Sequence, residues 1–333
     1  NDIDDLEFPD YSDYELASYT NKKGLVALPI TGSRGCVRAC TFCDIASMWP
    51  KYKYRSGHSI ATEIKTQVER YGAKAFRFTD SLINGSMKAF RDMTHELSTF
   101  RKSLPKDKRF IWDSHFIVRS RKQMPPEDFV KMAESGAGTL LIGVESGSPT
   151  VREHMKKGYT DEDLHYSLGE IFKNNIKVRF LMIIGYPTET QADYQQTLQF
   201  FDRYAEYGRQ GLVEEVNLGL TLNLLPNTPL YDNAEQHGLE TTKDHINDWV
   251  CSQNPTLDFK ERLKRRIEAQ YHVEKLGYKV FESKNYVRAL SIAWQEVQTI
   301  SKQKVLKVDA SKIKFDREKG TLEEKDFDPL RTY

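Results

Sequence analysis

Six short apolar segments, each followed by an amphipathic helical pattern, constrain the fold of this 333-residue chain more than any other feature. They are residues 24–30, 74–80, 109–115, 139–145, 177–185 and 214–225. Strand–helix units in series favour a parallel sheet with helices packed against it. Six units are too few for a complete eightfold barrel. We therefore expect an α/β fold, a partial (β/α)6 TIM-like barrel with a C-terminal helical extension.

The helices between these strands are predicted from apolar residues at helical spacing and from capping signals. Ile60, Ile64 and Val68 share one face of a helix that Gly72 would end. Such apolar stripes indicate core packing. Two further helices begin with capping boxes, at Thr160 with Asp163 and at Thr190 with Asp193.

The pattern changes after about residue 240, which predicts three parts. They are a lead-in over 1–23, the barrel over 24–240, and a C-terminal extension over 241–333. The extension has helical patterns at 257–277 and 287–301, and a charged tail begins at residue 302. The chain begins with Asn1 and not with Met, which leaves open that an upstream segment was removed.

Composition excludes several classes of protein. The apolar runs are too short to span a bilayer, and the chain does not begin with a signal segment. A formal net charge of +1 argues against a large nucleic-acid footprint. Three of the four cysteines lie within one short loop, which does not fit a secreted disulfide framework. We expect a cytoplasmic protein.

The cysteine loop, with Cys36, Cys40 and Cys43, follows the first predicted strand, at the barrel end where active sites lie. A structural zinc takes four protein ligands. The fourth would have to be His58 or Cys251, and neither has the usual paired spacing. Three thiolates on a 4Fe–4S cluster would instead leave one iron open, which indicates reactivity.

The spacing Cys-x3-Cys-x2-Cys, with Phe42 before the last cysteine, resembles the cluster motif of the radical S-adenosylmethionine superfamily. The resemblance extends over residues 25–239. It implies that Cys36, Cys40 and Cys43 each ligate one iron of a 4Fe–4S cluster. S-adenosylmethionine would chelate the fourth iron. Reductive cleavage would then release a 5′-deoxyadenosyl radical, which abstracts hydrogen from an unknown organic substrate.

The resemblance also implies residues that contact S-adenosylmethionine. Asp80, in "FTDSLING", is the candidate for the methionine amino group, with Ser81 and then Asn84 as weaker ones, although the usual Gly-Gly-Glu is absent. An acid at a strand end can instead cap the next helix. Glu145, in "IGVESGS", would contact the methionine or ribose part, with Ser146 beside it.

Further cofactor contacts are implied at the fifth and sixth segments. Arg179 would pair with the methionine carboxylate, because a guanidinium suits that geometry, or it is an ordinary surface arginine. The candidates near the adenine are Ile184, Gly185 and Leu224. Asp113, Ser114, His115 and Tyr186 could face the substrate, but the sequence assigns no catalytic side chain beyond the cluster ligands.

Segments such as "TGSRGC" and "IIGYPTET" resemble the branch whose members often carry a cobalamin-binding domain. This sequence has no Asp-x-His-x-x-Gly motif to supply a cobalt ligand, so cobalamin is left open but unsupported by these residues. The tRNA methylthiotransferase relatives share parts of the motif set. Their N-terminal three-cysteine domain is not visible here, and Cys251 alone cannot complete a second cluster.

Three hypotheses follow. The first is a radical S-adenosylmethionine enzyme that takes electrons from a reductant such as flavodoxin or ferredoxin and acts on a small molecule or peptide. The second is a cobalamin-linked methyltransferase, if an upstream domain was removed, or a tRNA-modifying enzyme. The third is a non-catalytic metal-binding module. "KERLKRR", residues 260–266, favours a solvated helix face over a nucleic-acid patch. Cys251 is expected to be a small buried residue.

Overall fold

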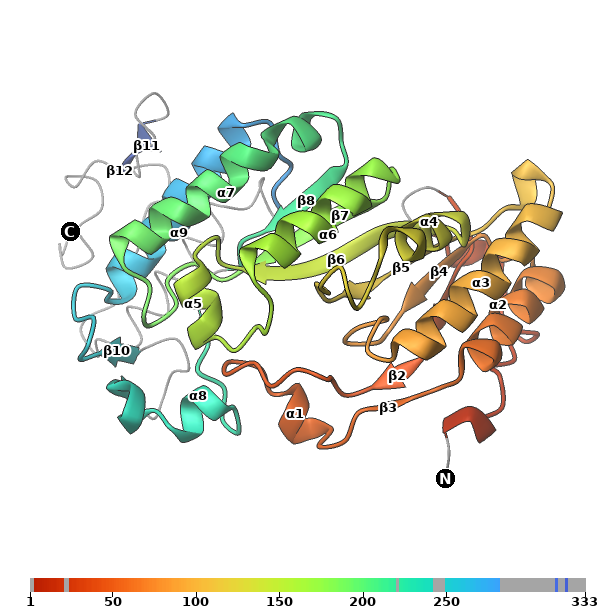
Figure 1. The fold of residues 1–333 in the computed structure, drawn as a ribbon, viewed down its shortest axis with the longest axis horizontal. Coiled ribbons are helices and arrows are strands. Elements are labelled where there is room, and N and C mark those ends of the chain that lie inside the picture. Colours follow the sequence, from red (N-terminus) through yellow and green to blue (C-terminus); the bar gives the residue numbers. More distant parts are fainter. Residues whose placement is uncertain are drawn as a thin grey trace. The chain divides into compact units, whose positions relative to one another are not determined.

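The computed structural model describes residues 3–20, 24–219, 222–241 and 249–281, and residues 315–316 and 321–322. The helix predicted at 287–301 and nearly all of the charged tail lie outside this part. Six strands form one sheet in the order β1-β4-β5-β6-β7-β8 (Figure 1). They are β1 (Ala27–Ile30), β4 (Ala75–Phe78), β5 (Ile111–Phe116), β6 (Ala137–Glu145), β7 (Lys177–Met182) and β8 (Val213–Asn217). All six predicted strands are present, and the predicted α/β class is confirmed.

The long helices follow these strands as predicted. They are α2 (Gly57–Tyr71), α3 (Met87–Ser103), α4 (Pro126–Glu134), α6 (Asp161–Lys173), α7 (Gln191–Arg209) and, in the extension, α9 (Phe259–Lys275). Helix α2 buries Ile60, Ile64 and Val68 and ends at Gly72, whose φ of 62° is left-handed. Both predicted capping boxes, at Thr160 and at Thr190, are formed.

Several shorter elements were not predicted, because segments of two to six residues carry too little periodicity. The helices among them are α1 (Ile45–Met48), α5 (Pro149–His154) and α8 (Pro229–Asp232). Three antiparallel pairs join β2 (Ser33–Arg34) to β3 (Lys53–Tyr54), β9 (Leu239–Thr241) to β10 (Trp249–Cys251), and β11 (Phe315–Asp316) to β12 (Thr321–Leu322).

The chain divides into two compact units. The first comprises Asn1–Ala39, Ile45–Gly143 and Gly158–Arg179. The second comprises Cys40–Asp44, Val144–Lys157 and Phe180–Tyr333. The cysteine loop is shared, with Cys36 in the first unit and the other two cysteines in the second. The boundaries predicted near residues 23 and 240 stay predictions.

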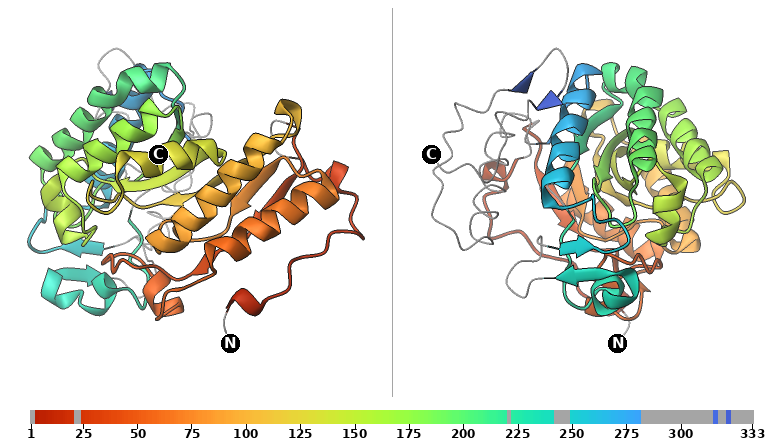
Figure 2. Two further views of the ribbon diagram at one scale, coloured as in Figure 1. Left: turned by 45° about the vertical axis from the view of Figure 1, so that its right-hand side comes forward. Right: turned by 90° about the vertical axis from the view of Figure 1, so that its left-hand side faces the viewer.

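In the first unit, the two faces of the sheet differ. Strands β1, β4 and β5 run parallel, and alternate side chains point to opposite faces. One face buries Ile30, Phe78 and Trp112. Helices α2 and α3 lie side by side and cover this part of the sheet (Figure 2). Arg77, on the other face, is exposed. Near the end of β4, side chains at even-numbered positions such as Phe78 therefore point to the helix-covered face, and those at odd-numbered positions such as Arg77 point to the other face.

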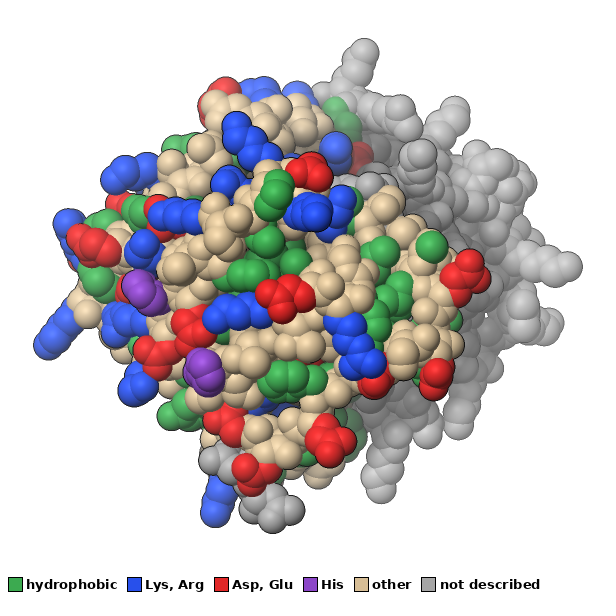
Figure 3. Space-filling model, turned by 90° about the vertical axis from the view of Figure 1, so that its right-hand side faces the viewer, with side chains coloured by type: hydrophobic (Ala, Val, Ile, Leu, Met, Phe, Trp, Pro, Cys, Tyr) green, Lys and Arg blue, Asp and Glu red, His purple; other side chains and the backbone are tan. Residues whose placement is uncertain are grey.

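Two further observations concern the charge of the surface and the length and polarity of the helices. On the face seen in Figure 3, Lys and Arg side chains are interspersed with Asp and Glu side chains. Each helix in the described part of the chain is too short or too polar to cross a membrane.

Candidate cofactor site

The cysteine loop presents three thiols. Cys36, Cys40 and Cys43 are all partly exposed, and none forms a disulfide. The Arg38 backbone N–H donates to the Cys36 sulfur at 3.4 Å, and the Cys43 N–H donates to the Cys40 carbonyl at 3.2 Å. A donor set made of thiols alone, on an accessible loop, suits an iron–sulfur cluster.

A single-metal site is not formed. Among the described residues, no three Cys, His, Asp or Glu side chains are gathered around one ion position. His58 is 77% exposed at its side chain and pairs with Glu96. Cys251 is buried among apolar residues, as predicted for a small core residue.

In the second unit, Thr41 fixes the Cys40–Asp44 part of the loop. Its N–H donates to the Met155 carbonyl at 3.1 Å, and its carbonyl accepts from the Leu230 N–H at 2.7 Å. Its buried hydroxyl lies 2.9 Å from that of Tyr186. Tyr186 is also buried, so its side chain supports the loop and does not line an open pocket. The thiols at positions 40 and 43 are thus presented from an ordered segment.

Glu145 ends β6 in a strained conformation. Its φ is 67°, which costs a residue other than glycine about 1–3 kcal/mol and is typical of functional sites. Its carboxylate lies 3.1 Å from the Lys157 ammonium. The same ammonium lies 5.8 Å from the centre of the Phe42 ring, a cation–π distance. Lys157, which the sequence did not single out, therefore joins two predicted cofactor-binding residues, Glu145 and Phe42.

Ser146 has a structural role in the same loop. Its hydroxyl is buried, lies 3.2 Å from the Thr197 hydroxyl, and accepts from the Ser148 N–H at 3.1 Å. Its carbonyl accepts from the Arg152 guanidinium at 2.7 Å. These bonds hold the turn that follows Glu145. The predicted contact of Ser146 with S-adenosylmethionine stays a prediction.

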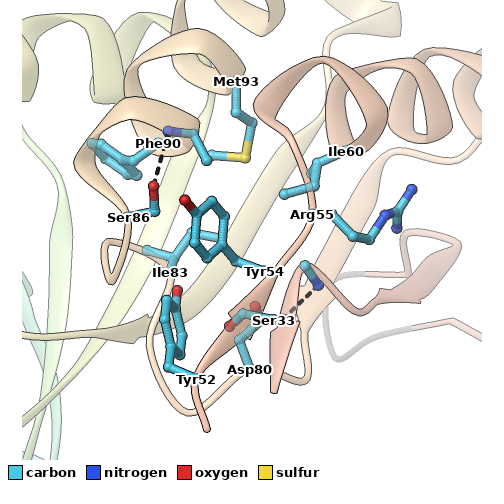
Figure 4. Close-up of a pocket in the computed structure, with 12 residues that line it drawn as sticks. Ser33, Tyr52, Tyr54, Arg55, Ile60, Asp80, Ile83, Ser86, Phe90 and Met93 are labelled. Atoms are coloured by element: carbon cyan, nitrogen blue, oxygen red, sulfur yellow. Dashed lines mark hydrogen bonds between the residues drawn. The ribbon is translucent and has the colours of Figure 1, made fainter. Parts of the chain in front are cut away.

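In the first unit, Asp80 points into a small pocket on the helix-covered side of β4 (Figure 4). Phe78 and Asp80 share this side because side chains alternate along a strand. The carboxylate accepts from the Gly32 N–H at 2.8 Å. Its other oxygen has no hydrogen-bond partner among the described residues. The pocket of about 250 Å³ is smaller than typical ligand sites. Its lining includes Ser33, Tyr52, Tyr54, Ile60, Phe90 and Met93.

Burial raises the pKa of Asp80 to about 6, while the Gly32 N–H lowers it. Because this pKa exceeds its unfolded value, the folded chain binds the proton more tightly. The contribution of this carboxyl to stability is therefore fully present below about pH 4 and is lost as the pH rises through about 6. Asp80→Asn mimics the protonated acid. We expect it to raise the free energy of unfolding at pH 8 by up to about 3 kcal/mol.

Urea unfolding of the metal-free protein between about pH 5 and pH 8 checks this expectation. The wild type should lose roughly 1–2 kcal/mol across that range relative to Asp80→Asn. Asp13→Asn, at an exposed position, is the matched control and should follow the wild type. Parallel curves for Asp80→Asn and the wild type would show that the buried carboxyl does not titrate there.

The other polar candidates near this strand end are held by structural bonds. Asn84 is buried, donates to the Ile117 carbonyl at 2.8 Å and accepts from the Ile117 N–H at 3.1 Å. His115 lies with Nδ1 3.1 Å from the Asp80 carbonyl, and burial lowers its pKa. Ser81 is partly exposed. Asn84 therefore serves the loop geometry, while Ser81 and His115 remain accessible in part.

In the second unit, Glu189 and Arg265 organise the turn at Gly185. Glu189 is fully buried and accepts from the Gly185 N–H at 3.1 Å and from Arg265 at 3.2 Å. Burial raises the pKa of Glu189 to about 7, although Arg265 lowers it. Gly185 itself has a φ of 80°. The predicted adenine contacts Ile184 and Leu224 are both buried here in the second unit, and their roles stay predictions.

Gly185→Ala should destabilise the protein by about 2–5 kcal/mol. The left-handed φ is strained for alanine, and an added Cβ would lie 2.7 Å from the Arg262 Cγ. Gly169→Ala is the matched control. Gly169 lies within helix α6, and a Cβ added there would have no other atom within 4 Å. It should stabilise by about 0.5–1 kcal/mol. Thermal unfolding measures both, and equal effects would contradict the close approach at Gly185.

The basic stretch at 260–266 corrects a prediction. We expected a solvated helix face, or alternatively a nucleic-acid patch, yet Arg262, Arg265 and Arg266 are all buried. Arg262 stacks on Trp249 with 3.6 Å to the ring centre and donates to two backbone carbonyls. Arg265 pairs with Glu189 and Glu261. A guanidinium can be buried when its donors are satisfied and its plane stacks on an aromatic ring.

Arg179 lies within β7 in the first unit and is half-buried. Its side chain points to the face opposite that of Val178 and Phe180, both of which are buried. The predicted pairing of Arg179 with a carboxylate stays a prediction.

Comparison with known proteins identifies the family. A family pattern described as the Radical SAM superfamily matches residues 30–201, just over half of the chain. A bacteriochlorophyllide d C-12(1)-methyltransferase of Chlorobaculum tepidum is 24% identical over 196 residues, covering 58% of this chain and 41% of that protein. A tRNA-2-methylthio-N(6)-dimethylallyladenosine synthase of Hydrogenobaculum is 27% identical over 285 residues, covering 83% and 62%.

A solved structure shows the same fold. The radical S-adenosylmethionine methyltransferase TsrM of Kitasatospora setae matches with a TM-score of 0.57 at 17% identity, over 82% of this chain and 57% of that one. The likeness supports the TIM-like barrel fold. The chain spans about two fifths of the length of the first curated relatives it matches. The chain belongs to the radical SAM superfamily, whose cofactors are a 4Fe–4S cluster and S-adenosylmethionine.

Proposed function

We propose that this chain binds one 4Fe–4S cluster through Cys36, Cys40 and Cys43 and reductively cleaves S-adenosylmethionine to modify an organic substrate. The three-cysteine loop is the observation that supports this proposal. Its thiols form no disulfide and are partly exposed, and the family match over residues 30–201 includes them. When bound, the cluster supplies one electron that breaks the C5′–sulfur bond, giving methionine and a 5′-deoxyadenosyl radical.

The chain's own residues would bind and orient the cofactor. In the second unit, Glu145 would hold the methionine or ribose part, with its charge balanced by Lys157 and with Ser146 and Phe42 nearby in sequence or space. Ile184, Gly185 and Leu224 would contact the adenine. In the first unit, Asp80 and Ser81 would serve the amino group, and Arg179 the carboxylate. These roles follow from the family resemblance and from burial at strand ends.

Methyl transfer is the second candidate reaction. Two curated relatives are named a methyltransferase and a hopanoid C-2 methylase, and the TsrM structure is described with cobalamin bound. The residues of this chain include no Asp-x-His-x-x-Gly motif for a cobalt ligand. A role for cobalamin would therefore need either another mode of binding in these residues or an upstream cobalamin-binding domain.

A tRNA substrate has less support. Several relatives are named as tRNA-modifying synthases. The basic stretch that could have served RNA places Arg265 and Arg266 in the interior of the second unit. We therefore favour a small molecule or peptide as substrate. The reductant would be a small electron carrier such as a flavodoxin or ferredoxin, and the four free cysteines fit a reducing, cytoplasmic compartment.

Electron paramagnetic resonance on the anaerobically reconstituted, reduced protein tests the proposal. A cluster signal that changes when S-adenosylmethionine is added, together with 5′-deoxyadenosine by mass spectrometry, is the expected result. S-adenosylhomocysteine without 5′-deoxyadenosine would favour methyl transfer. A protein that holds stoichiometric zinc and gives no cluster signal would be a non-catalytic metal-binding module.

A further inference from the structure

Two arginines of the first unit lie near Cys36. Arg38 follows Cys36 on the loop, and its backbone N–H donates to the Cys36 sulfur at 3.4 Å. Its side chain donates to the carbonyls of Gly158 at 2.7 Å and Val118 at 3.3 Å. Val118 directly precedes Arg119, the second arginine. The Arg38 side chain therefore contacts the backbone next to Arg119.

Arg119 is held in the interior by backbone carbonyls. Its side chain donates to Asn84 at 2.8 Å and to Gly85 at 2.9 Å, and the residue is 9% exposed. The ring of Tyr52 packs against the same short turn, because a Cβ added at Gly85 would lie 2.2 Å from its hydroxyl oxygen. The charge of Arg119 is therefore fixed in position close to the start of the cysteine loop.

Neither charge is balanced by an acid. In the part of the chain that the structure describes, no carboxylate pairs with Arg38 or Arg119, and the Nε atom of each has no hydrogen-bond partner. Two other arginines of the first unit differ in this respect, since Arg55 pairs with Glu63 and Arg91 with Asp128. A buried cation without a counter-charge is costly. Such a pair points to an anion that belongs beside it.

The electrostatic coupling of these groups supports the same conclusion. Burial lowers the pKa of Arg119, Arg38 lowers it further, and Tyr52 and Cys36 raise it. Arg38 and Arg119 thus repel each other, while negative charge at Cys36 attracts Arg119. An iron–sulfur cluster ligated by three thiolates is an anion, and it gains one more negative charge when it is reduced.

We propose that Arg38 and Arg119 stabilise the reduced form of the cluster at Cys36 and so raise the reduction potential of that cluster. This proposal rests on the proposed function. Net charge and hydrogen bonds to the sulfurs are among the terms that set such potentials. Removing one guanidinium should lower the ratio of reduced to oxidised cluster at a fixed potential by about tenfold. That change corresponds to about 59 mV for a one-electron couple.

The test is a redox titration, followed by electron paramagnetic resonance, of reconstituted protein without S-adenosylmethionine. Arg119→Gln and Arg38→Gln should each lower the midpoint potential, and Arg119→Lys, which keeps the charge, should restore most of the difference. Arg121→Gln is the matched control. It removes the same charge at an exposed position where the guanidinium lies over the Tyr166 ring, so its potential should equal that of the wild type.

A second measurement separates charge from structure. In the metal-free protein, Arg38→Gln removes one of two like charges, so its unfolding midpoint should be equal to or higher than that of the wild type. A lower midpoint with an unchanged potential would overturn the proposal and make Arg38 a structural tie to Gly158. So would equal losses in Arg119→Gln and Arg119→Lys. If the Arg119→Gln variant takes up no iron, the midpoint potential of the Arg38→Gln variant still tests the proposal, because Arg38 is only partly buried. A wild-type protein without any cluster would instead refute the proposed function itself.

Discussion

Replacing Cys36, Cys40 and Cys43 together by alanine should abolish both the cluster and the cleavage of S-adenosylmethionine. Each thiolate would ligate one iron of the cluster. The fold should survive, because all three side chains are partly exposed and lie outside the core. Iron and sulfide analysis after anaerobic reconstitution, together with detection of 5′-deoxyadenosine, measures the effect.

Cys251→Ala is the matched control for that experiment. Cys251 is 2% exposed within an apolar cluster that includes Trp249 and Leu239. Its loss should leave a small cavity that costs about 1 kcal/mol of stability, with cluster content and cleavage unchanged. A triple variant that still produced 5′-deoxyadenosine would place the cluster elsewhere or remove the assignment.

Glu145→Gln should reduce the cleavage of S-adenosylmethionine by about 100-fold or more. The substitution keeps the shape of the side chain and removes the charge that faces Lys157 at 3.1 Å. It would remove this carboxylate charge at the point where the cofactor is proposed to bind. The cluster signal without S-adenosylmethionine should stay as in the wild type, because Glu145 is not a proposed iron ligand.

Titration of S-adenosylmethionine, followed by electron paramagnetic resonance, distinguishes loss of binding from loss of the cluster. Glu153→Gln provides a control with the same chemical change at an exposed position of α5. It should cleave the cofactor at the wild-type rate. If Glu145→Gln also cleaved S-adenosylmethionine at the wild-type rate, cofactor binding would not explain the strained conformation of Glu145 at the end of β6.

Strand positions were predictable because buried parallel strands are short apolar runs between helical patterns. The ends of the last two were not. We predicted a strand over 177–185, but β7 ends at Met182, and Gly185 turns the chain with a φ of 80°. We predicted another over 214–225, but β8 ends at Asn217. Leu222 and Leu224 are apolar because they pack in a core cluster as a loop, which a sequence pattern cannot distinguish from a strand.

In the candidate site, too, features set by residues close in sequence were predictable, and contacts between residues far apart in sequence were not. Three cysteines at fixed spacing are a local pattern, and so is their place after a strand. The groups that support them are not, since Thr41 and Tyr186 are 145 residues apart and Arg38 and Val118 are 80 apart. Lys157 lies 12 residues from Glu145, across a short helix that periodicity does not reveal. The buried arginines of α9 were misjudged because charge predicts solvent exposure unless the partners are known.

Helix α9 sets a lower bound on how far the protein can be shortened. The family pattern ends at residue 201, yet the turn at Gly185 depends on Arg262 and Arg265, well beyond it. A truncated protein that kept only the matched region would lose both the guanidinium that pairs with Glu189 and the Arg262 side chain that packs against Gly185. The conserved chemistry of a superfamily and the smallest autonomously folding piece of this chain are therefore different stretches of sequence.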